Sequence, residues 1–448
     1  MNILQALRLK KNIKLAAVGA GGKSSFLFDL GYQLPGKVII STTTHISIEQ
    51  SRMGDIHIVE NDPMLFDKIR LAEDNAVIVI TGSYFEVERV NGPSNEVLER
   101  ISRFCDDNDC SVLLEADGSK KLPLKAHGEN EPVVPSWINV VVHVVGCSAF
   151  NQLVGSDTIF RLEKYCQLTN QIPGEIISVP AVCRLLNHAE GGLKHIRAAQ
   201  NSIILFNQLD QITPGVLSEI EQYIPDLLTC HNQVLFGTTS NSPKEINEIR
   251  YCYENTAGVI LAAGGSNRLG TLKQLLIIGN ESFLRLTIKK AIDSHLAPII
   301  VVLGHEYDRL NKEIEDLPIT IVNNNNWQKG QSTSVIEGSK HLSAFAPIGG
   351  ALFMTIDQPF LNEATIQKIV RCHTSNIGKS IVPRCDGQNG SPVLIDADSF
   401  SEIRKVKGDK GARSILHTLP HTYLDIHNCK ELLDIDTKAQ YDKHFGSE

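Results

Sequence analysis

The chain has 448 residues, of which 42% are hydrophobic and 21% charged, and its formal net charge is -8. A globular domain typically has about 100–200 residues, so this length predicts two or three domains of ordinary soluble composition. The negative charge and the lack of a basic stripe argue against nucleic-acid binding. No apolar run approaches the roughly 18–20 residues of a membrane span, and the N-terminus lacks a long apolar signal segment. We therefore expect a cytoplasmic protein with no nucleic-acid or membrane partner.

The ten cysteines are scattered from Cys105 to Cys429, and no C-x-x-C pair occurs. In a cytoplasmic chain of this length, such cysteines are expected to be reduced residues of the core.

Short apolar runs rich in β-branched residues recur along the chain, separated by helical patterns. In chain order they are "IKLAAV", "KVIIS", "AVIVIT", "SVLLEAD", "VVVHVVG", "SIILFN", "GVILAAG", "PIIVVLG", "ALFMTID" and "SIVPR". This alternation predicts an α/β fold with parallel sheets covered by helices on both faces. The polar stretch 237–258 is the best candidate for a linker. We therefore predict two separate domains, residues 1–240 and 256–448.

The first phosphate-binding candidate is "KLAAVGAGGKSSFLFDL", a glycine-rich turn between a strand and a helix. It resembles a P-loop, in which backbone amides cradle phosphates, a lysine reaches them and a hydroxyl binds Mg²⁺. The match is imperfect, because Ala17 stands where the first glycine of the motif belongs. The predicted nucleotide-binding residues are Gly19, Gly21, Gly22, Lys23, Ser24 and Ser25.

Two later strand ends in this half carry polar residues. "SVLLEADGS" ends in Glu115 and Asp117, and we predict Asp117 as a metal ligand. "LFNQLD" offers Asn207 and Asp210 as readers of a nucleotide base, although both residue types are also common turn formers.

The second phosphate-binding candidate is "VILAAGGSNRLGTLKQLL", which begins at Val259. Gly264 and Gly265 let the backbone approach a ligand closely, and the following helix N-terminus favours an anion. Arg268 and Lys273 add positive charge. The alternative is a glycine-rich turn with two solvated cations.

Acidic residues further along complete this predicted site. "ALFMTIDQPF" is a strand that ends in Asp357, and "LLDIDT" supplies Asp434 and Asp436 near the C-terminus. Carboxylates facing a phosphate loop are suited to hold the Mg²⁺ of phosphoryl or nucleotidyl transfer. Asp357 and Asp436 are the predicted metal ligands, and each has the alternative of being a turn or cap residue.

The loop "LAAGGSNRLGTLKQLL" resembles the signature loop of the molybdenum cofactor nucleotidyltransferases, L-A-[AG]-G-x-S-x-R-[ML]-G-x-x-K-x-L-L. The five-residue spacing from Arg268 to Lys273 differs from that of sugar-nucleotide pyrophosphorylases. Ala262-Ala263-Gly264 is typical of the MocA-like cytidylyltransferases in this group and favours CTP. The resemblance implies nucleotide binding by Leu261, Ala262, Ala263, Gly264, Gly265 and Ser266.

Further blocks are similar to the same branch: "NNNNWQKGQSTSVIEG", "TIDQPF", "GQNGSPVLI", "GDKGARSIL" and "DIDT". They imply that Ser334 lies near the base, and that Arg268, Lys273 and Asp357 are catalytic. One departure concerns Ser391, which stands where the family often has a histidine. The implied fold over about residues 256–445 is a Rossmann-like nucleotidyltransferase (MobA/GT-A-like) α/β domain.

The N-terminal blocks "VGAGGKSS", "TTTH" and "EADGSKKLPLKAHGENEPVVP" resemble YqeC-type accessory proteins, which are linked to selenium-dependent molybdenum hydroxylases. This resemblance implies a P-loop-like parallel α/β domain over about residues 5–240. Lys121, Lys125 and His127 form a basic loop around Pro123 that either meets an anionic substrate or is a solvated face.

Together the resemblances imply a fusion that acts late in the maturation of a molybdenum hydroxylase cofactor. The C-terminal domain is expected to transfer CMP from CTP to molybdopterin, with Mg²⁺ as cofactor and release of pyrophosphate. The N-terminal domain is expected to bind ATP or GTP for a selenium-related step, and an apo molybdenum hydroxylase is a candidate partner. The alternatives are a nucleotidyltransferase that acts on a sugar phosphate, or a nucleotide-gated cofactor chaperone.

Overall fold

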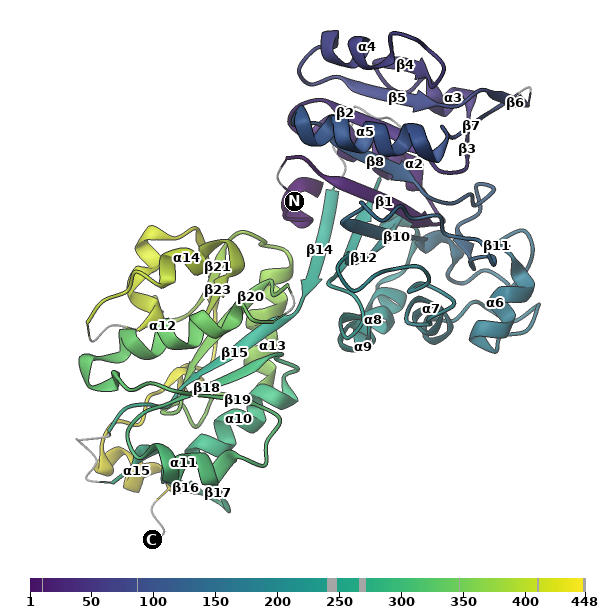
Figure 1. The fold of residues 1–448 in the computed structure, drawn as a ribbon. Helices are drawn as coiled ribbons and strands as arrows, with labels where there is room; N and C mark the ends of the chain where they lie inside the picture. The colour runs from purple at the N-terminus through teal and green to yellow at the C-terminus, as the bar shows by residue number, and fades with distance from the viewer. Residues whose placement is uncertain are drawn as a thin grey trace. The chain divides into compact units, whose positions relative to one another are not determined.

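The computed structural model describes residues 1–9, 11–86, 88–239, 248–265, 271–345, 347–408 and 411–445. The chain divides into two compact units, Met1–Tyr253 and Glu254–Glu448. Each unit is a sheet with helices packed on both faces (Figure 1). The α/β class with two domains is therefore confirmed.

The N-terminal unit is built on a nine-stranded sheet. All strand pairs with a defined register in this sheet are parallel, and β1 lies between β10 and β8. In spatial order the strands are β14 (Glu248–Glu254), β13 (Gln233–Thr238), β12 (Asn201–Asn207), β10 (Val140–Gly146), β1 (Lys14–Gly19), β8 (Ser111–Glu115), β2 (Val38–Thr42), β5 (Val77–Thr81) and β4 (Ile56–Val59).

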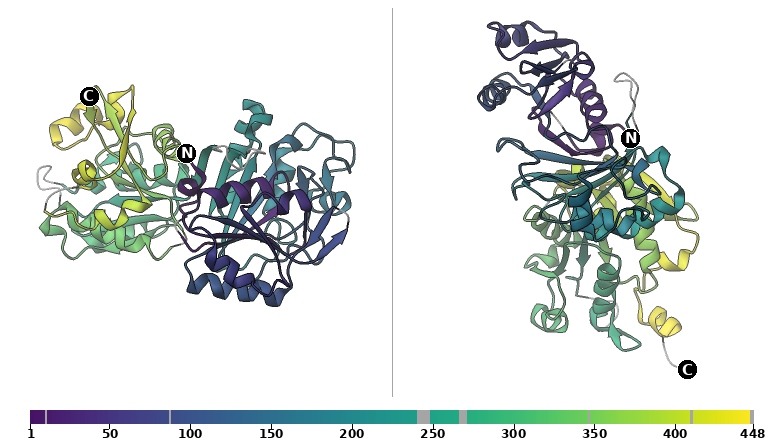
Figure 2. Two further views of the ribbon diagram at one scale, coloured as in Figure 1. Left: turned by 90° about the horizontal axis from the view of Figure 1, so that it is seen from above. Right: turned by 90° about the vertical axis from the view of Figure 1, so that its right-hand side faces the viewer.

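Helix α2 (Lys23–Gln33) packs on one face of this sheet, where its Gly31 meets Ile40 and Leu113. Helices α4 (Leu65–Leu71) and α5 (Asn95–Asp107) cover the other face (Figure 2). The remaining helices are α1 (Ile3–Ala6), α3 (Ile48–Ser51), α6 (Leu162–Thr169), α7 (Val179–Leu186), α8 (Pro214–Gln222) and α9 (Ile224–Leu228). Two small sheets are formed by β3 (His45–Ser47), β7 (Arg89–Asn91) and β6 (Tyr84–Glu86), and by β9 (Leu124–Lys125) and β11 (Ile159–Phe160).

The expected linker 237–258 is partly regular structure. Strand β14 occupies 248–254 and joins the N-terminal sheet beside β13, so the first unit runs to Tyr253. Only Ile249 and Cys252 of its seven residues are buried, and the other five are exposed or half-buried. That pattern marks a strand at the edge of a sheet, which a search for long apolar runs does not detect.

The C-terminal unit has an eight-stranded mixed sheet. Its strands are β19 (Thr320–Asn323), β18 (Ile299–Leu303), β15 (Thr256–Leu261), β20 (Gly350–Thr355), β23 (Val393–Asp396), β21 (Ser380–Cys385), β22 (Gln388–Asn389) and β24 (His421–Asp425). Strand β23 runs antiparallel to both β20 and β21, so the expectation of a parallel sheet is wrong here. All four residues of β23 are buried, and a fully buried run carries no signal of strand direction.

Both faces of the C-terminal sheet are covered by helices. One apolar cluster joins the sheet to α10 (Phe283–Asp293), α11 (Tyr307–Ile314) and α13 (Glu363–Thr374). The opposite cluster includes α12 (Gln331–Leu342) and α14 (Phe400–Ile403). A hairpin of β16 (Ile277–Ile278) and β17 (Glu281–Ser282) and the helix α15 (Lys438–Phe445) complete the unit.

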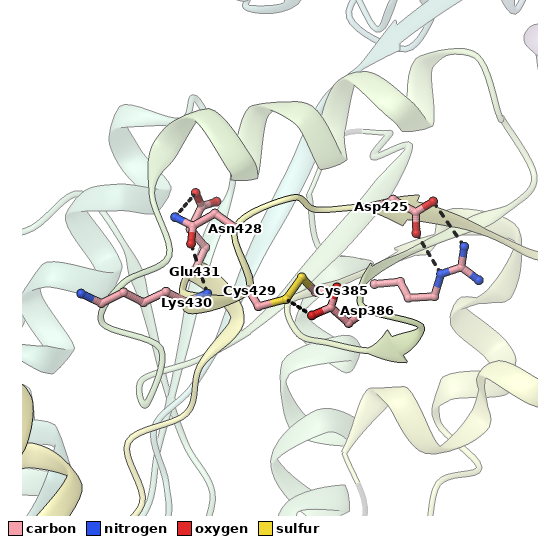
Figure 3. Close-up of a disulfide and its surroundings, with 8 residues drawn as sticks. Cys385, Asp386, Asp425, Asn428, Cys429, Lys430 and Glu431 are labelled. Carbon is pink, nitrogen blue, oxygen red and sulfur yellow. Dashed lines mark hydrogen bonds and ion pairs between the residues drawn. A yellow bond between two sulfur atoms is a disulfide. The ribbon is translucent and has the colours of Figure 1, made fainter.

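Cys385 and Cys429 form a disulfide, which corrects the expectation that all ten cysteines are reduced (Figure 3). Strands β21 and β24 pair in parallel, with Arg384 opposite Asp425, so the two chain segments leave the sheet together. The cysteines are 44 residues apart in sequence, and their Cα atoms come within 5.5 Å. The other eight cysteines form no disulfide bond. In the described part of the chain, the helices are too short or too polar to cross a bilayer.

Candidate functional site

The N-terminal phosphate loop lies between β1 and α2, at the carboxyl end of the sheet. Gly21 and Gly22 have φ angles of +85° and +113°, which L-residues rarely adopt. A Cβ on Gly21 would lie 2.3 Å from the backbone of Gly146, and one on Gly22 would lie 2.3 Å from the amide nitrogen of Asn207. Glycine is therefore required at both positions, and both glycines line a cleft.

Lys23 is held in place at the start of α2 by three oxygen acceptors. Its ammonium donates to the Gly19 carbonyl at 2.7 Å, and lies 3.2 Å from Asp117 and 3.7 Å from Glu115. Burial alone would lower the pKa of Lys23, but the two carboxylates outweigh it and raise the pKa above its ordinary value. The lysine therefore stays charged at the wall of the cleft.

Asp117 is not placed as a metal ligand, which differs from the prediction. Its carboxylate is fully buried and lies 2.9 Å from Lys125 and 3.2 Å from His127. Burial favours the neutral acid, but Lys23, His127 and Lys125 hold the pKa of Asp117 below its usual range. Glu115 faces the cleft instead and accepts a hydrogen bond from Ser24 at 2.6 Å.

Asn207 and Asp210 do not reach the cleft as readers of a base. The buried side chain of Asn207 donates to the Gly21 carbonyl at 2.8 Å and accepts from Thr239. Asp210 accepts from Thr238 at 3.1 Å. Asn207 therefore supports the glycine-rich loop through its hydrogen bond to Gly21. Its neighbour Gln208 lines the cleft.

The cleft beside this loop has a volume of about 990 Å³. Five predicted residues line it: Gly21, Gly22, Lys23, Ser24 and Ser25. Lys125 and His127 of the predicted basic loop do not line the cleft, because both are buried in contact with Asp117. Lys120 and Lys121 line the cleft. Gln50, Phe160 and Arg161 also line it and come from segments in which the sequence shows no motif.

In the C-terminal unit, two hollows of about 520 and 500 Å³ meet at the end of strand β20. The first is lined by Leu261, Ala262, Ala263, Gly264, Gly265, Lys273, Ser334 and Asp357, all of which were predicted site residues. Four residues, Leu261, Gln331, Thr355 and Asp357, line both hollows. The predicted residues Ser266 and Arg268 lie outside the described residues.

The buried side-chain amides of Gln274 and Asn324 position two walls of the first hollow. Gln274 donates to the carbonyls of Ala262 and Gly264 at 2.9 and 2.7 Å and thereby fixes the loop after β15. Asn324 donates to the Ser334 hydroxyl at 2.9 Å. Neither residue follows from a sequence pattern, because a buried amide leaves no periodic signal.

Lys273, Asp357 and Asp436 come together as the sequence predicts. The Lys273 ammonium lies 2.8 Å from Asp436 and 3.3 Å from Asp357. The second oxygen of Asp357 is buried with no hydrogen-bond partner among the described residues. Burial, together with Asp357 and Asp436, raises the pKa of nearby Asp434 to about 6. Excess carboxylate charge and an unsatisfied carboxylate oxygen fit a divalent cation.

The second hollow is lined by polar residues that include Ser391, Ser414 and Asp434. Gln358 donates to the carbonyls of Ser391 and Leu432 at 3.0 and 3.2 Å. The Ile435 amide donates to the Asp357 carbonyl at 2.8 Å. These bonds hold the segment that carries Asp434 and Asp436 beside the end of β20.

Comparison with known proteins identifies both units. Residues 15–163 match the YqeC protein family, and residues 258–423 match the MobA-like NTP transferase domain. The chain thus joins a YqeC domain to a MobA-like NTP transferase domain, as the motifs predict.

Three relatives illustrate this division. The uncharacterized protein YqeC of Escherichia coli K12 is 26% identical over 206 residues, which cover 45% of this chain and 78% of the relative. Purine catabolism protein PucB of Bacillus subtilis 168 is 28% identical over 199 residues, 41% of this chain and 93% of PucB. The molybdenum cofactor cytidylyltransferase of Escherichia coli K12 is 27% identical over 187 residues, 41% of this chain and 92% of that enzyme.

Proposed function

We propose that residues 256–448 transfer CMP from CTP to molybdopterin and release pyrophosphate. The observation that carries this proposal is the pair of hollows that meet at Asp357, because a two-substrate transfer needs adjacent sites for nucleotide and acceptor. Similarity to the relative named molybdenum cofactor cytidylyltransferase supports the choice of substrates.

In this proposal CTP lies in the hollow between the loop after β15 and Ser334. Ala263 lines that hollow, and its Cβ is proposed to limit the space for a base. The acceptor lies in the second hollow, and an oxygen of its terminal phosphate forms a bond to the α-phosphorus of CTP. The bond from the α-phosphorus to the bridging oxygen of the β-phosphate breaks, and pyrophosphate leaves. The acceptor phosphate is already anionic, so no general base is required.

Asp357 and Asp436 are the residues that would hold Mg²⁺, which neutralises charge on the triphosphate in transfers of this kind. Lys273 bridges these carboxylates and supplies a fixed positive charge to the same triphosphate. Arg268 of the same loop adds a second cation in this proposal.

For the N-terminal unit we propose binding of ATP or GTP, with the phosphates on the loop 19–25. The close-packed glycines, the charged Lys23 and the pair Ser24 and Glu115 support this role. The proposed context is a selenium-related step for a selenium-dependent molybdenum hydroxylase, whose apo form is the proposed recipient of the cofactor.

The test is to incubate the full chain and Mg²⁺ with molybdopterin and CTP, GTP, ATP or UTP in turn, and to identify the products by mass. We expect a cytosine dinucleotide of molybdopterin and pyrophosphate, with CTP used best. Ala263→Gly should admit some GTP because a purine needs more room. A wild-type preference for GTP, or transfer to sugar phosphates only, would reject the proposal.

A further inference from the structure

We propose that the N-terminal cleft binds a second anionic ligand, a phosphorylated substrate, on Lys120, Lys121 and Arg161 beside the nucleotide phosphates. All three cations line the same cleft as the glycine loop. The inference goes beyond the proposed function and rests on it only for the identity of the first ligand, the nucleotide.

Lys120 and Lys121 form the centre of a tight turn closed by a hydrogen bond from the Leu122 amide to the Ser119 carbonyl, 3.0 Å long. Their φ angles are +51° and +62°. Asparagine and glycine are the residues that favour two successive positive φ angles, and lysine is strained there. A strained turn that carries two lysines into a cleft indicates a role for their side chains.

These two lysines add positive charge to the cleft wall, in addition to the other charged residues that line it. Lys23 and Lys125 are neutralised by buried carboxylates, and Arg161 pairs with Glu131 at 2.9 Å. Lys120 and Lys121 are exposed, and within the described ranges neither ammonium has a carboxylate within 4.0 Å. An anionic ligand would therefore meet two unpaired cations.

Arg161 and Phe160 form a rigid neighbouring wall. Arg161 also has a positive φ of +63°, and its guanidinium packs so closely on Gly128 that a Cβ there would lie 2.6 Å from the guanidinium carbon. The Phe160 ring lies 5.0 Å from that guanidinium and 5.2 Å from the Lys120 ammonium. Strand β11, which ends at Phe160, pairs with β9 just after the lysine turn.

The two anion-binding walls meet at Pro123. The Pro123 carbonyl accepts from the Gly146 amide at 2.9 Å, and a Cβ on Gly21 would lie 3.0 Å from the same oxygen. The lysine turn thus adjoins the phosphate loop. Both walls line one cleft of about 990 Å³, at the upper end of the roughly 300–1,000 Å³ of ligand pockets.

The test is calorimetric titration of inorganic phosphate into the full chain saturated with a non-hydrolysable ATP analogue. We expect Lys120→Ala/Lys121→Ala to weaken phosphate binding at least tenfold, and more than it weakens binding of the analogue. Lys68→Ala/Lys164→Ala, which removes the same charge from the same unit outside the cleft, should bind phosphate like the wild type. Thermal unfolding of each variant confirms that the fold is retained.

Phosphate binding that is equal in the two double variants would overturn the proposal. So would loss of phosphate binding when the analogue saturates the wild type, because the cleft would then hold one ligand. If Lys23→Ala leaves binding of the analogue unchanged but the Lys120 and Lys121 variant loses phosphate, the proposed nucleotide site fails and the second anion site stands.

Discussion

At the scale of single residues, Asp357 is the side chain on which the proposed transfer depends most. It lines both hollows and has a buried oxygen without a hydrogen-bond partner among the described residues. Asp357→Asn keeps the shape and removes the charge, so we expect kcat for nucleotidyl transfer to fall about 100-fold or more with the fold intact. Steady-state kinetics at several Mg²⁺ concentrations measure the effect.

Asp425→Asn is the matched control, because Asp425 pairs with Arg384 at the surface, away from the hollows. It should retain turnover close to that of the wild type. Normal Mg²⁺-dependent activity in the Asp357 variant would show that another residue holds the metal.

His231 should make the stability of the N-terminal unit depend on pH. Burial lowers its pKa to about 4, although a hydrogen bond with the Leu186 carbonyl partly opposes the shift. The unfolded chain binds a proton on His231 more tightly than the folded chain does. The contribution of neutral His231 to the free energy of unfolding is therefore fully present above about pH 6.5, and it is lost as the pH falls towards 4. The shift corresponds to about 3 kcal/mol at most.

Urea unfolding from pH 7 to pH 4 checks this expectation. In a Trp327→Phe background, the remaining Trp137 reports on the N-terminal unit alone. His231→Gln should flatten the pH dependence, and His45→Gln, which changes an exposed histidine, should not. If the free energy of unfolding depended on pH equally in the His231 and His45 variants, His231 would not be the source of the pH dependence.

The structure places Lys23 in the N-terminal cleft and Lys273 beside Asp436, where the glycine loops and strand ends of the sequence predict them. The sequence does not predict the burial of Asp117, because a strand-end aspartate has the same pattern whether it faces a cleft or is covered by Lys125 and His127. Gln358 is missed as a support because its partners, Ser391 and Leu432, come from distant segments.

At the scale of elements, the disulfide ties the segment after β24 to the end of β21 (Figure 3). That segment continues to Asp434 and Asp436. Closing a loop of this length contributes about 2–4 kcal/mol by restricting the unfolded chain. We expect Cys385→Ser to lower the stability of the C-terminal unit by this amount and to reduce transfer, because the segment that carries Asp434 and Asp436 loses a tether.

Thermal unfolding and activity with and without dithiothreitol measure both effects. Reduction should shift the wild type towards the Cys385→Ser variant and leave that variant unchanged. Cys230→Ser, which removes an exposed free thiol, is the control. A wild type that is insensitive to reduction would show that the bridge contributes nothing to the site.

Strand direction and strand partners are the part of the fold that the sequence does not predict. The apolar runs identify most strands, but β23 reads like the parallel strands around it because its residues are all buried. The predicted linker includes strand β14, because this edge strand has no long apolar run.

At the scale of the whole molecule, each unit has its own sheet, glycine loop and lysine, so we expect two separable nucleotide sites. Lys23→Ala should weaken nucleotide binding by the N-terminal unit by about 1.5–3 kcal/mol and change cytidylyl transfer only a few-fold. Lys273→Ala should do the reverse. Both activities are measured in both variants, and a large loss of transfer in Lys23→Ala would mean that the units share one active site.

The wall that the two C-terminal hollows share has a consequence for inhibitor design. Because Leu261, Gln331, Thr355 and Asp357 line both hollows, the two hollows lie next to each other. If the proposed substrates occupy these hollows, a cytidine linked through a short, uncharged bridge to a pterin would bind its second half at a high effective concentration. The affinity of the linked molecule should therefore be much higher than that of either fragment. An enzyme that has only one of the two pockets would bind only one half, so it should bind the linked molecule more weakly.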